Sequence, residues 1–447
     1  MFHFSKKNFI KISTILTILS LPLHAYAADK KIIAKRYFSN FPLAKGNYNG
    51  ISSASDGLIY YVLCSGDLDT GAQMYSYNPK SDKITHLADL TEIVGEKGQK
   101  SIPQGKSHVN YYEYKGKLYF ATHIDFYTHV DGKEILGIPP EGYKPYPGGH
   151  IVSYDMTSGN FEDLGIASKT KGGVLAQTMD RTRGRLYGII WPSGEVYRYD
   201  VESRDLKTLG KFFADGEEGN GDRYLVLSRS LTVDETTGNV FFANPLGEIY
   251  QYILAKDEIE KVTSENLVKD YFGHLDVHRS MGYQWRQSIW SDYDKMIYGV
   301  HLESEYLFRL NPKTGKIEFL DRLASPTTKR AGVTGYGGSL GLTFGENNHT
   351  LYHISHAYPS EEDFKQFGSD AVSKLGLKNH HLISYDLKDH KYSDLGEITF
   401  EDGSEPVHIN SLAYGADGNF YAVTTIELQV GNIASDLISF PNPNVTQ

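Results

Sequence analysis

Residues 108–123 read HVNYYEYKGKLYFATH. Aromatic and apolar residues alternate with polar ones on both sides of Lys115-Gly116, a dipeptide that suits a tight turn. The pattern predicts two antiparallel strands, from His108 to Tyr114 and from Lys117 to His123. Two further strands are predicted from Ile151 to Asp155 and from Phe161 to Gly165, around a turn at Ser158-Gly159. The stretch therefore begins a unit of four short strands.

The apolar–aromatic pair Leu118-Tyr119 recurs along the chain at intervals of 54 to 69 residues. Its equivalents are Ile59-Tyr60, Leu186-Tyr187, Val240-Phe241, Ile297-Tyr298, Leu351-Tyr352 and Phe420-Tyr421. A repeat of this length, with several strands in each unit, is typical of a β-propeller. The sequence predicts an all-β fold in the form of a seven-bladed β-propeller.

The last predicted blade lacks an outer strand, because the chain ends soon after Phe440-Pro441. An unassigned strand from Lys31 to Phe38 lies at the other end of the chain. We expect this N-terminal strand to complete the last blade and close the ring, which would leave no sheet edge open.

The first 27 residues have the features of a secretory signal peptide. Lys6, Lys7 and Lys11 precede an apolar run from Ile12 to Leu23, and Ala25-Tyr26-Ala27 fits a cleavage site. We therefore expect residues 28–447 to form one propeller domain, located in the periplasm or secreted, as a monomer without a membrane anchor. The lone Cys64 has no disulfide partner in the chain, so it is either a buried inert thiol or a metal ligand.

The charge of the chain excludes a general affinity for polyanions. Its 45 basic and 55 acidic residues give a net charge of −10, and loss of the three leader lysines makes it −13. Nucleic-acid binding would need a basic face, so we expect none. A locally basic site can still bind an acidic polymer, because a desolvated site outweighs screened distant charge.

One rim of the predicted ring collects candidate site residues. The start of a first strand and the end of a second strand meet there, and the long insertion 124–149 follows His123 directly. Aromatic and polar side chains together suit sugars. The candidates for substrate binding are Tyr127, His150, Asn244, Trp285, Arg286 and His301.

The strongest candidates for catalysis at this rim are His108 and His123. They lie on adjacent strands of one blade, and histidine suits proton transfer near neutral pH. Arg229, about two blades further on, can face them and bind an anionic group. A satisfied polar side chain remains the alternative for each histidine taken singly.

A structural zinc ion is a further prediction for this rim. The blades that carry His353, His356, His408 and Cys64 are neighbours in a closed ring, so these four side chains can share a metal. No organic cofactor is expected.

The exported propeller, its aromatic insertions and the pair His108 and His123 facing a basic residue resemble the propeller-type ulvan lyases of marine bacteria. The resemblance covers residues 28–447 at the level of architecture. It implies cleavage by β-elimination next to a uronic acid, with a basic group on the carboxylate and a His or Tyr taking the C5 proton. Tyr224 is the candidate for the tyrosine of that family, and Arg229 for its basic group.

The sequence thus predicts a polysaccharide lyase acting on a uronate-containing, sulfated, ulvan-like glycan. Two alternatives stay open: a noncatalytic propeller that binds glycan or protein, and a glycoside hydrolase using Asp or Glu. A propeller fold alone does not decide among them.

Overall fold

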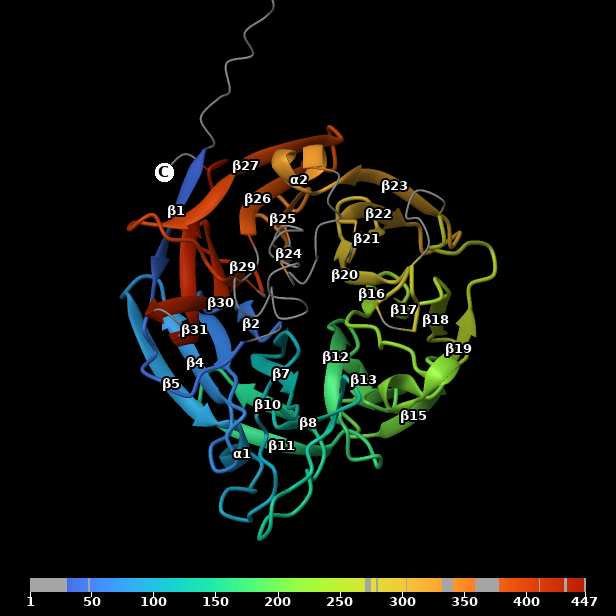
Figure 1. The fold of residues 1–447 in the computed structure, drawn as a ribbon. Coiled ribbons are helices and arrows are strands. Elements are labelled where there is room, and N and C mark those ends of the chain that lie inside the picture. Colours follow the sequence, from blue (N-terminus) through green and yellow to red (C-terminus); the bar gives the residue numbers. More distant parts are fainter. Residues whose placement is uncertain are drawn as a thin grey trace, which may run out of the picture.

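Antiparallel strands make up almost all of the regular structure in the computed structural model (Figure 1). It describes residues 30–46, 49–269, 275–278, 280–302, 304–331, 341–357, 378–409, 411–429 and 432–445. The predicted signal peptide lies outside these residues. Among them, no helix is long and apolar enough to cross a membrane.

Five separate sheets of four strands each follow one another along the described chain. The first contains β2 (Ile51–Ser53), β3 (Ile59–Leu63), β4 (Gln73–Asn78) and β5 (Lys83–Asp89). The second contains β6 (Tyr112–Tyr114), β7 (Lys117–Ala121), β10 (His150–Asp155) and β11 (Phe161–Ile166). The third contains β12 (Gly173–Asp180), β13 (Arg185–Trp191), β14 (Glu195–Asp200) and β15 (Leu206–Lys211).

The fourth sheet contains β16 (Thr232–Asp234), β17 (Asn239–Ala243), β18 (Ile249–Ile253) and β19 (Glu258–Lys261). The fifth contains β20 (Trp285–Ser291), β21 (Met296–His301), β22 (Tyr306–Leu310) and β23 (Ile317–Arg322). Each apolar–aromatic pair of these sheets lies in the second strand, as the repeat predicts.

Nine further strands join into one sheet. Its members are β1 (Lys31–Arg36), β24 (Leu342–Phe344), β25 (Thr350–Ala357), β26 (Lys378–Asp386), β27 (Lys391–Phe400), β28 (His408–Ile409), β29 (Ala413–Tyr414), β30 (Asn419–Gln429) and β31 (Asn432–Pro441). The N-terminal strand β1 joins its two halves: Lys31 to Ala34 pair in parallel with β27, and Lys35 and Arg36 pair antiparallel with β31. Figure 1 shows β1 between these two strands, and shows the sheets succeeding one another around a ring.

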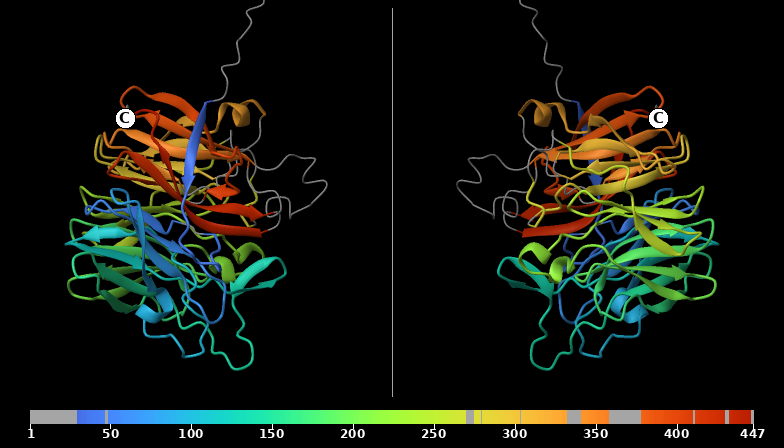
Figure 2. Two further views of the ribbon diagram at one scale, coloured as in Figure 1. Left: turned by 90° about the vertical axis from the view of Figure 1, so that its left-hand side faces the viewer. Right: turned by 90° about the vertical axis from the view of Figure 1, so that its right-hand side faces the viewer.

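A two-stranded ribbon, β8 (Tyr127–Val130) and β9 (Lys133–Leu136), occupies the insertion after His123. In side view it stands out on one face of the ring (Figure 2). The described helical segments are short: α1 (Leu90–Ile93), α2 (Pro326–Ala331), and the 3-10 turns η1 (Gly216–Glu218) and η2 (Gly221–Arg223). Lys133 Nζ ties the ribbon to the η1–η2 loop through the carbonyl of Gly219, at 2.9 Å.

A polar contact anchors three of the recurring tyrosines in the second strand. In each of them the hydroxyl donates to an aspartate four residues earlier, in the turn that precedes the strand. This contact is found for Tyr60 and Asp56 at 2.6 Å, Tyr298 and Asp294 at 2.6 Å, and Tyr421 and Asp417 at 2.7 Å. The rings themselves are buried between neighbouring sheets, where the hydrophobic core lies.

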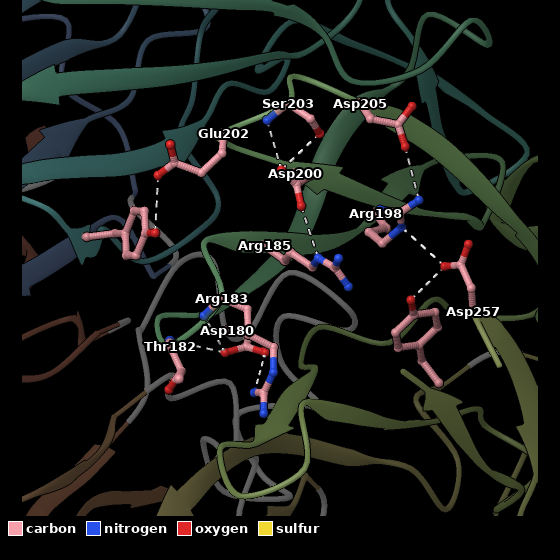
Figure 3. Close-up of polar contacts among 12 residues, drawn as sticks. Asp180, Thr182, Arg183, Arg185, Arg198, Asp200, Glu202, Ser203, Asp205 and Asp257 are labelled. Atoms are coloured by element: carbon pink, nitrogen blue, oxygen red, sulfur yellow. Dashed lines mark hydrogen bonds and ion pairs between the residues drawn. The ribbon is translucent and has the colours of Figure 1, made fainter. Parts of the chain in front are cut away.

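The strands and hairpins of the third sheet are stabilised by ion pairs (Figure 3). Asp180 is buried and accepts from Arg183 at 2.9 Å, within the β12–β13 hairpin. Arg198 contacts Asp205 at 3.1 Å and Asp257, from the next sheet, at 3.3 Å. Arginines in this region therefore hold hairpins and neighbouring sheets together.

The first strand of the second sheet is shorter than the sequence predicts. β6 begins at Tyr112, and its register with β7, extended outward, would pair His108 with His123. His123 pairs instead with Lys106, through backbone hydrogen bonds of 2.7 and 2.9 Å. This shift removes His108 from the ladder and frees its ring to turn toward the third sheet.

Candidate functional site

The predicted histidine pair is present at the end of the second sheet. The ring centroids of His108 and His123 lie 5.8 Å apart. Nδ1 of His108 lies 2.7 Å from the carbonyl oxygen of Leu175, and Nδ1 of His123 lies 2.6 Å from that of Ile124. Because a carbonyl only accepts, both Nδ1 atoms carry the proton. Among the described residues, Nε2 of His123 has no hydrogen-bond partner, so it keeps an available lone pair.

Both histidines are held neutral. Burial, then the positive charge of Lys106, lowers the pKa of His123 to about 3. Burial, then His123 itself, lowers the pKa of His108 well below its usual value. Lys106 is buried in an ion pair with Asp125, with 2.6 Å between Nζ and Oδ1. A neutral imidazole can accept a proton, but a pKa of about 3 makes His123 a weak base, well below the pKa near the working pH that favours general base catalysis.

Aromatic rings enclose His123. Trp191 at the end of β13 lies 5.6 Å from it between centroids, and Tyr127 packs edge-on against Trp191 at 5.3 Å. A Cβ atom on Gly173 would come within 2.7 Å of the His123 ring, so only glycine fits there. His123 is 1% exposed, so its ring belongs to the packed interior at this end of the sheet.

Arg229 extends the cluster from the fourth sheet. It donates to Oε1 of Glu217 at 2.6 Å and to the carbonyl of Leu227 at 2.8 Å. Its charge lowers the pKa of both histidines as a minor cause, which brings it into their electrostatic range. Tyr224 is coupled to Arg229 and Glu217, and burial raises its pKa to about 12. Of the four residues predicted for catalysis, His108 and His123 therefore pack against each other, Arg229 acts electrostatically on both, and Tyr224 is linked to them only through Arg229.

Arg286 lies at the same end of the molecule, on β20. Its charge acts on His108 and on His408, which begins β28 of the nine-stranded sheet. Lys106, Arg229 and Arg286 lie around the histidines, but Asp125 and Glu217 balance the charges of the first two.

Four of the predicted binding residues have structural roles. Trp285 is wholly buried and stacks on Phe308 at 5.1 Å, so its ring offers no open face to a sugar. Asn244 holds the β17–β18 turn through Glu248, at 2.8 Å. His301 bonds through both ring nitrogens, to Ser304 and to the carbonyl of Gly282. These residues were predicted from their position at strand ends. That position does not tell whether a side chain points into the core or toward a ligand.

His150 is the fourth, and it forms an internal clamp. Nδ1 lies 2.9 Å from Asp163 and Nε2 lies 3.1 Å from Glu96. Burial disfavours its charged form, but hydrogen bonds to these two carboxylates outweigh burial and raise its pKa to about 9. His150 is therefore a cation that joins the second sheet to the loop after α1. Tyr127, by contrast, stays within the histidine cluster.

Among the residues that the structure describes, no group of three His, Cys, Asp or Glu side chains is arranged to hold a metal ion. Cys64 is buried, and its electrostatic neighbours are Asp125 and Lys106. His353 contacts Gly341 and Glu305 instead. His356 and His408 do approach each other, with 6.1 Å between ring centroids. Metal analysis of protein purified without added zinc remains the test of the predicted zinc site.

The sequence reasoning missed Lys106, Asp125, Trp191 and Glu217. Trp191 ends the second strand of its sheet, the position that singled out His123, so the same rule applied to β13 finds it. Lys106 and Asp125 flank the two histidines at a spacing of two, which places alternate residues on one side of an extended chain. Glu217 lies in a loop turn, and no sequence pattern indicates it.

A cavity of about 640 Å³ runs along the middle of the ring. Its lining comes from the first strands of successive sheets and from β29, and includes Gln177, Arg229 and Gln287. A hydrogen bond of 3.2 Å between Asn49 and Gln287 joins two sheets that are not neighbours, so it crosses this channel. Asn49 also donates to the carbonyl of His108, at 3.4 Å.

Sheets arranged around a central channel define an all-β, β-propeller-like protein. No protein-family model and no curated protein matches the chain. One similar solved structure is the "Crystal Structure of Mitotic Checkpoint Complex", at 10% identity and TM-score 0.50, covering 98% of this chain and 99% of that one. A structural genomics protein of unknown function from Bacteroides thetaiotaomicron is 12% identical with TM-score 0.40, over 90% and 71% of the two chains. The first likeness supports the mostly-β fold alone.

Proposed function

We propose that this protein is a secreted polysaccharide lyase that cleaves a uronate-containing, ulvan-like glycan by β-elimination. The observation that carries the proposal is the state of His123: a neutral ring whose proton is committed to the Ile124 carbonyl, beside positive charge from Lys106 and Arg229. A base next to cationic groups is what removal of a proton beside a carboxylate requires.

In the proposed reaction, Arg229 binds the uronate carboxylate and so acidifies the C5 proton. Nε2 of His123 takes that proton, the C4–O bond breaks with its electron pair on oxygen, and a C4–C5 double bond forms. The hydroxyl of Tyr224, which its raised pKa keeps protonated at neutral pH, supplies a proton to the leaving oxygen. Because His123 is buried, substrate reaches Nε2 only when the packing around its ring opens.

The test is the product formed from a panel of uronate polymers. A lyase creates a double bond conjugated to the carboxylate and new ultraviolet absorbance. A hydrolase creates reducing ends without that absorbance. Absence of both products from every polymer would contradict the proposal.

We further propose seven blades, with β1 closing the ring. Supporting this count, β24–β27 repeat the four-strand order of the five separate sheets, and β28 to β31 supply another set with β1 at its outer edge. The same proposal includes residues 1–27 as a cleaved leader, export of a monomer, and an acidic polysaccharide as the partner.

A noncatalytic glycan-binding propeller is the second candidate. The burial of His108 and His123, 6% and 1% exposed, favours it, because buried groups can serve packing alone. Such a protein would retain uronate oligosaccharides without changing them, which the product assay and a binding measurement together detect.

A further inference from the structure

The buried carboxylate of Glu217 lies between two parts of the candidate site. Oε2 accepts from Nε1 of Trp191 at 2.7 Å, and Oε1 accepts from the backbone of Leu227 at 2.9 Å and from Arg229 at 2.6 Å. Glu217 itself is 8% exposed, and its own backbone donates to the carbonyl of Pro192 at 2.9 Å. Three donors on a fixed carboxylate leave it one orientation.

On one side, Glu217 fixes the guanidinium of Arg229. The second contact of that guanidinium, with the carbonyl of Leu227, comes from the residue whose N–H also binds Glu217. Charge-assisted hydrogen bonds of this kind are short and directional. The position of Arg229 therefore depends on the Glu217 charge.

On the other side, Glu217 fixes the indole of Trp191, whose ring packs against His123. One carboxylate is thus linked to the group proposed to bind the substrate anion and to the group proposed to take the proton. Arg229 lines the central channel, and Glu217 holds it there from behind the channel wall.

We propose that Glu217 is a positioning residue that sets the geometry of Arg229 for a substrate carboxylate and, through Trp191, the ring of His123. The inference rests on the proposed function. To that function it adds one point: the buried carboxylate of Glu217 sets the orientation in which Arg229 binds the substrate anion.

The first experiment compares Glu217→Gln with Glu218→Gln in the full mature protein. Glu218 is the matched control, since it lies in the same turn but is about half exposed and only 3.4 Å from Lys211. An amide that keeps its oxygen toward Arg229 turns its NH₂ toward the Trp191 N–H, so two donors oppose each other. We expect Glu217→Gln to raise KM about tenfold and to lower kcat, and Glu218→Gln to change neither.

A double-mutant cycle with Trp191→Phe separates positioning from folding. Phe removes the opposed N–H but keeps a ring against His123, so kcat of Glu217→Gln should partly recover in the double variant while KM stays high. Melting temperature is recorded for every variant. A loss of thermal stability with unchanged KM and kcat would mean that Glu217 is structural only, and would overturn the inference.

Calorimetric measurement of uronate oligosaccharide binding shows whether the proposed lyase activity or the proposed positioning role of Glu217 has failed. If the wild type binds it without forming a double bond, and only Glu217→Gln weakens binding, lyase action is wrong and the positioning of Arg229 stands. If the wild type cleaves and both glutamine variants behave alike, the positioning role is wrong. A wild type that neither binds nor cleaves overturns both.

Discussion

At the residue scale, the function proposed here depends on His123. Replacing it by asparagine removes the base, and proton-transfer groups of this kind contribute roughly two to four orders of magnitude to rate. We expect kcat of His123→Asn to fall by that amount, with circular dichroism checking the fold. His129→Asn is the control, because the His129 side chain is exposed and its ion pair with Glu134, at 3.5 Å, lies on the surface. A folded His123→Asn variant with most of its turnover would place the site elsewhere.

Two buried histidines should shape stability in opposite directions with pH. The folded-state pKa of His123, about 3, lies below its value in an unfolded chain, about 6.5. The free energy of unfolding should therefore fall as pH drops from 6.5 toward 3, because the unfolded state takes up the proton. The pKa of His150, about 9, is raised, so its contribution is full below 6.5 and is lost as pH rises through 9.

Urea unfolding across this pH range tests the assignment of His150. A His150→Gln variant should lose stability at neutral pH and show a flatter decline on the alkaline side. An alkaline decline identical to that of the wild type would show that the clamp of Asp163 and Glu96 does not hold a charged ring.

At the scale of elements, the stability of the nine-stranded sheet depends on β1. Lys35 pairs with Asp82 at 2.7 Å, Arg36 with Asp402 at 3.0 Å, and the backbone of Tyr37 with that of Leu437. Deleting residues 28–38 removes these contacts and uncovers the edges of β27 and β31, which invites aggregation. We expect a lower melting temperature and oligomers in light scattering, and unchanged melting would contradict the proposed closure.

The positions of strands were predicted correctly where a local sequence pattern determines them. The prediction failed where contacts between neighbouring segments determine where a strand begins or which way a side chain points. The apolar–aromatic pairs located the second strands because turn, alternation and the aspartate contact are all local. The start of β6 was wrong because Lys106 takes the pairing position opposite His123, which the alternation of the hairpin does not reveal. Trp285 and His301 were assigned to ligand binding because strand-end position does not say which way a side chain turns.

At the scale of the whole molecule, cationic side chains surround the candidate site of a negatively charged protein, two of them paired with buried carboxylates. Binding of an acidic oligosaccharide should therefore weaken as ionic strength rises, while binding of a neutral analogue should stay weak throughout. Arg229→Gln should remove most of the salt dependence, and the exposed Arg181→Gln, 3.0 Å from Glu235, should not. Equal salt dependence in both variants would contradict an anion site at Arg229.

The pairing of β1 has a consequence for the order in which the protein becomes native. Its partners, β27 and β31, lie far along the sequence: the hydroxyls of Tyr37 and Ser439, 3.0 Å apart, are separated by 402 positions. The entropic cost of closing so long a loop grows slowly with length, but the contact cannot form before Ser439 has been synthesised. Until β31 has been synthesised, Lys35 and Arg36 of β1 therefore have no antiparallel partner strand.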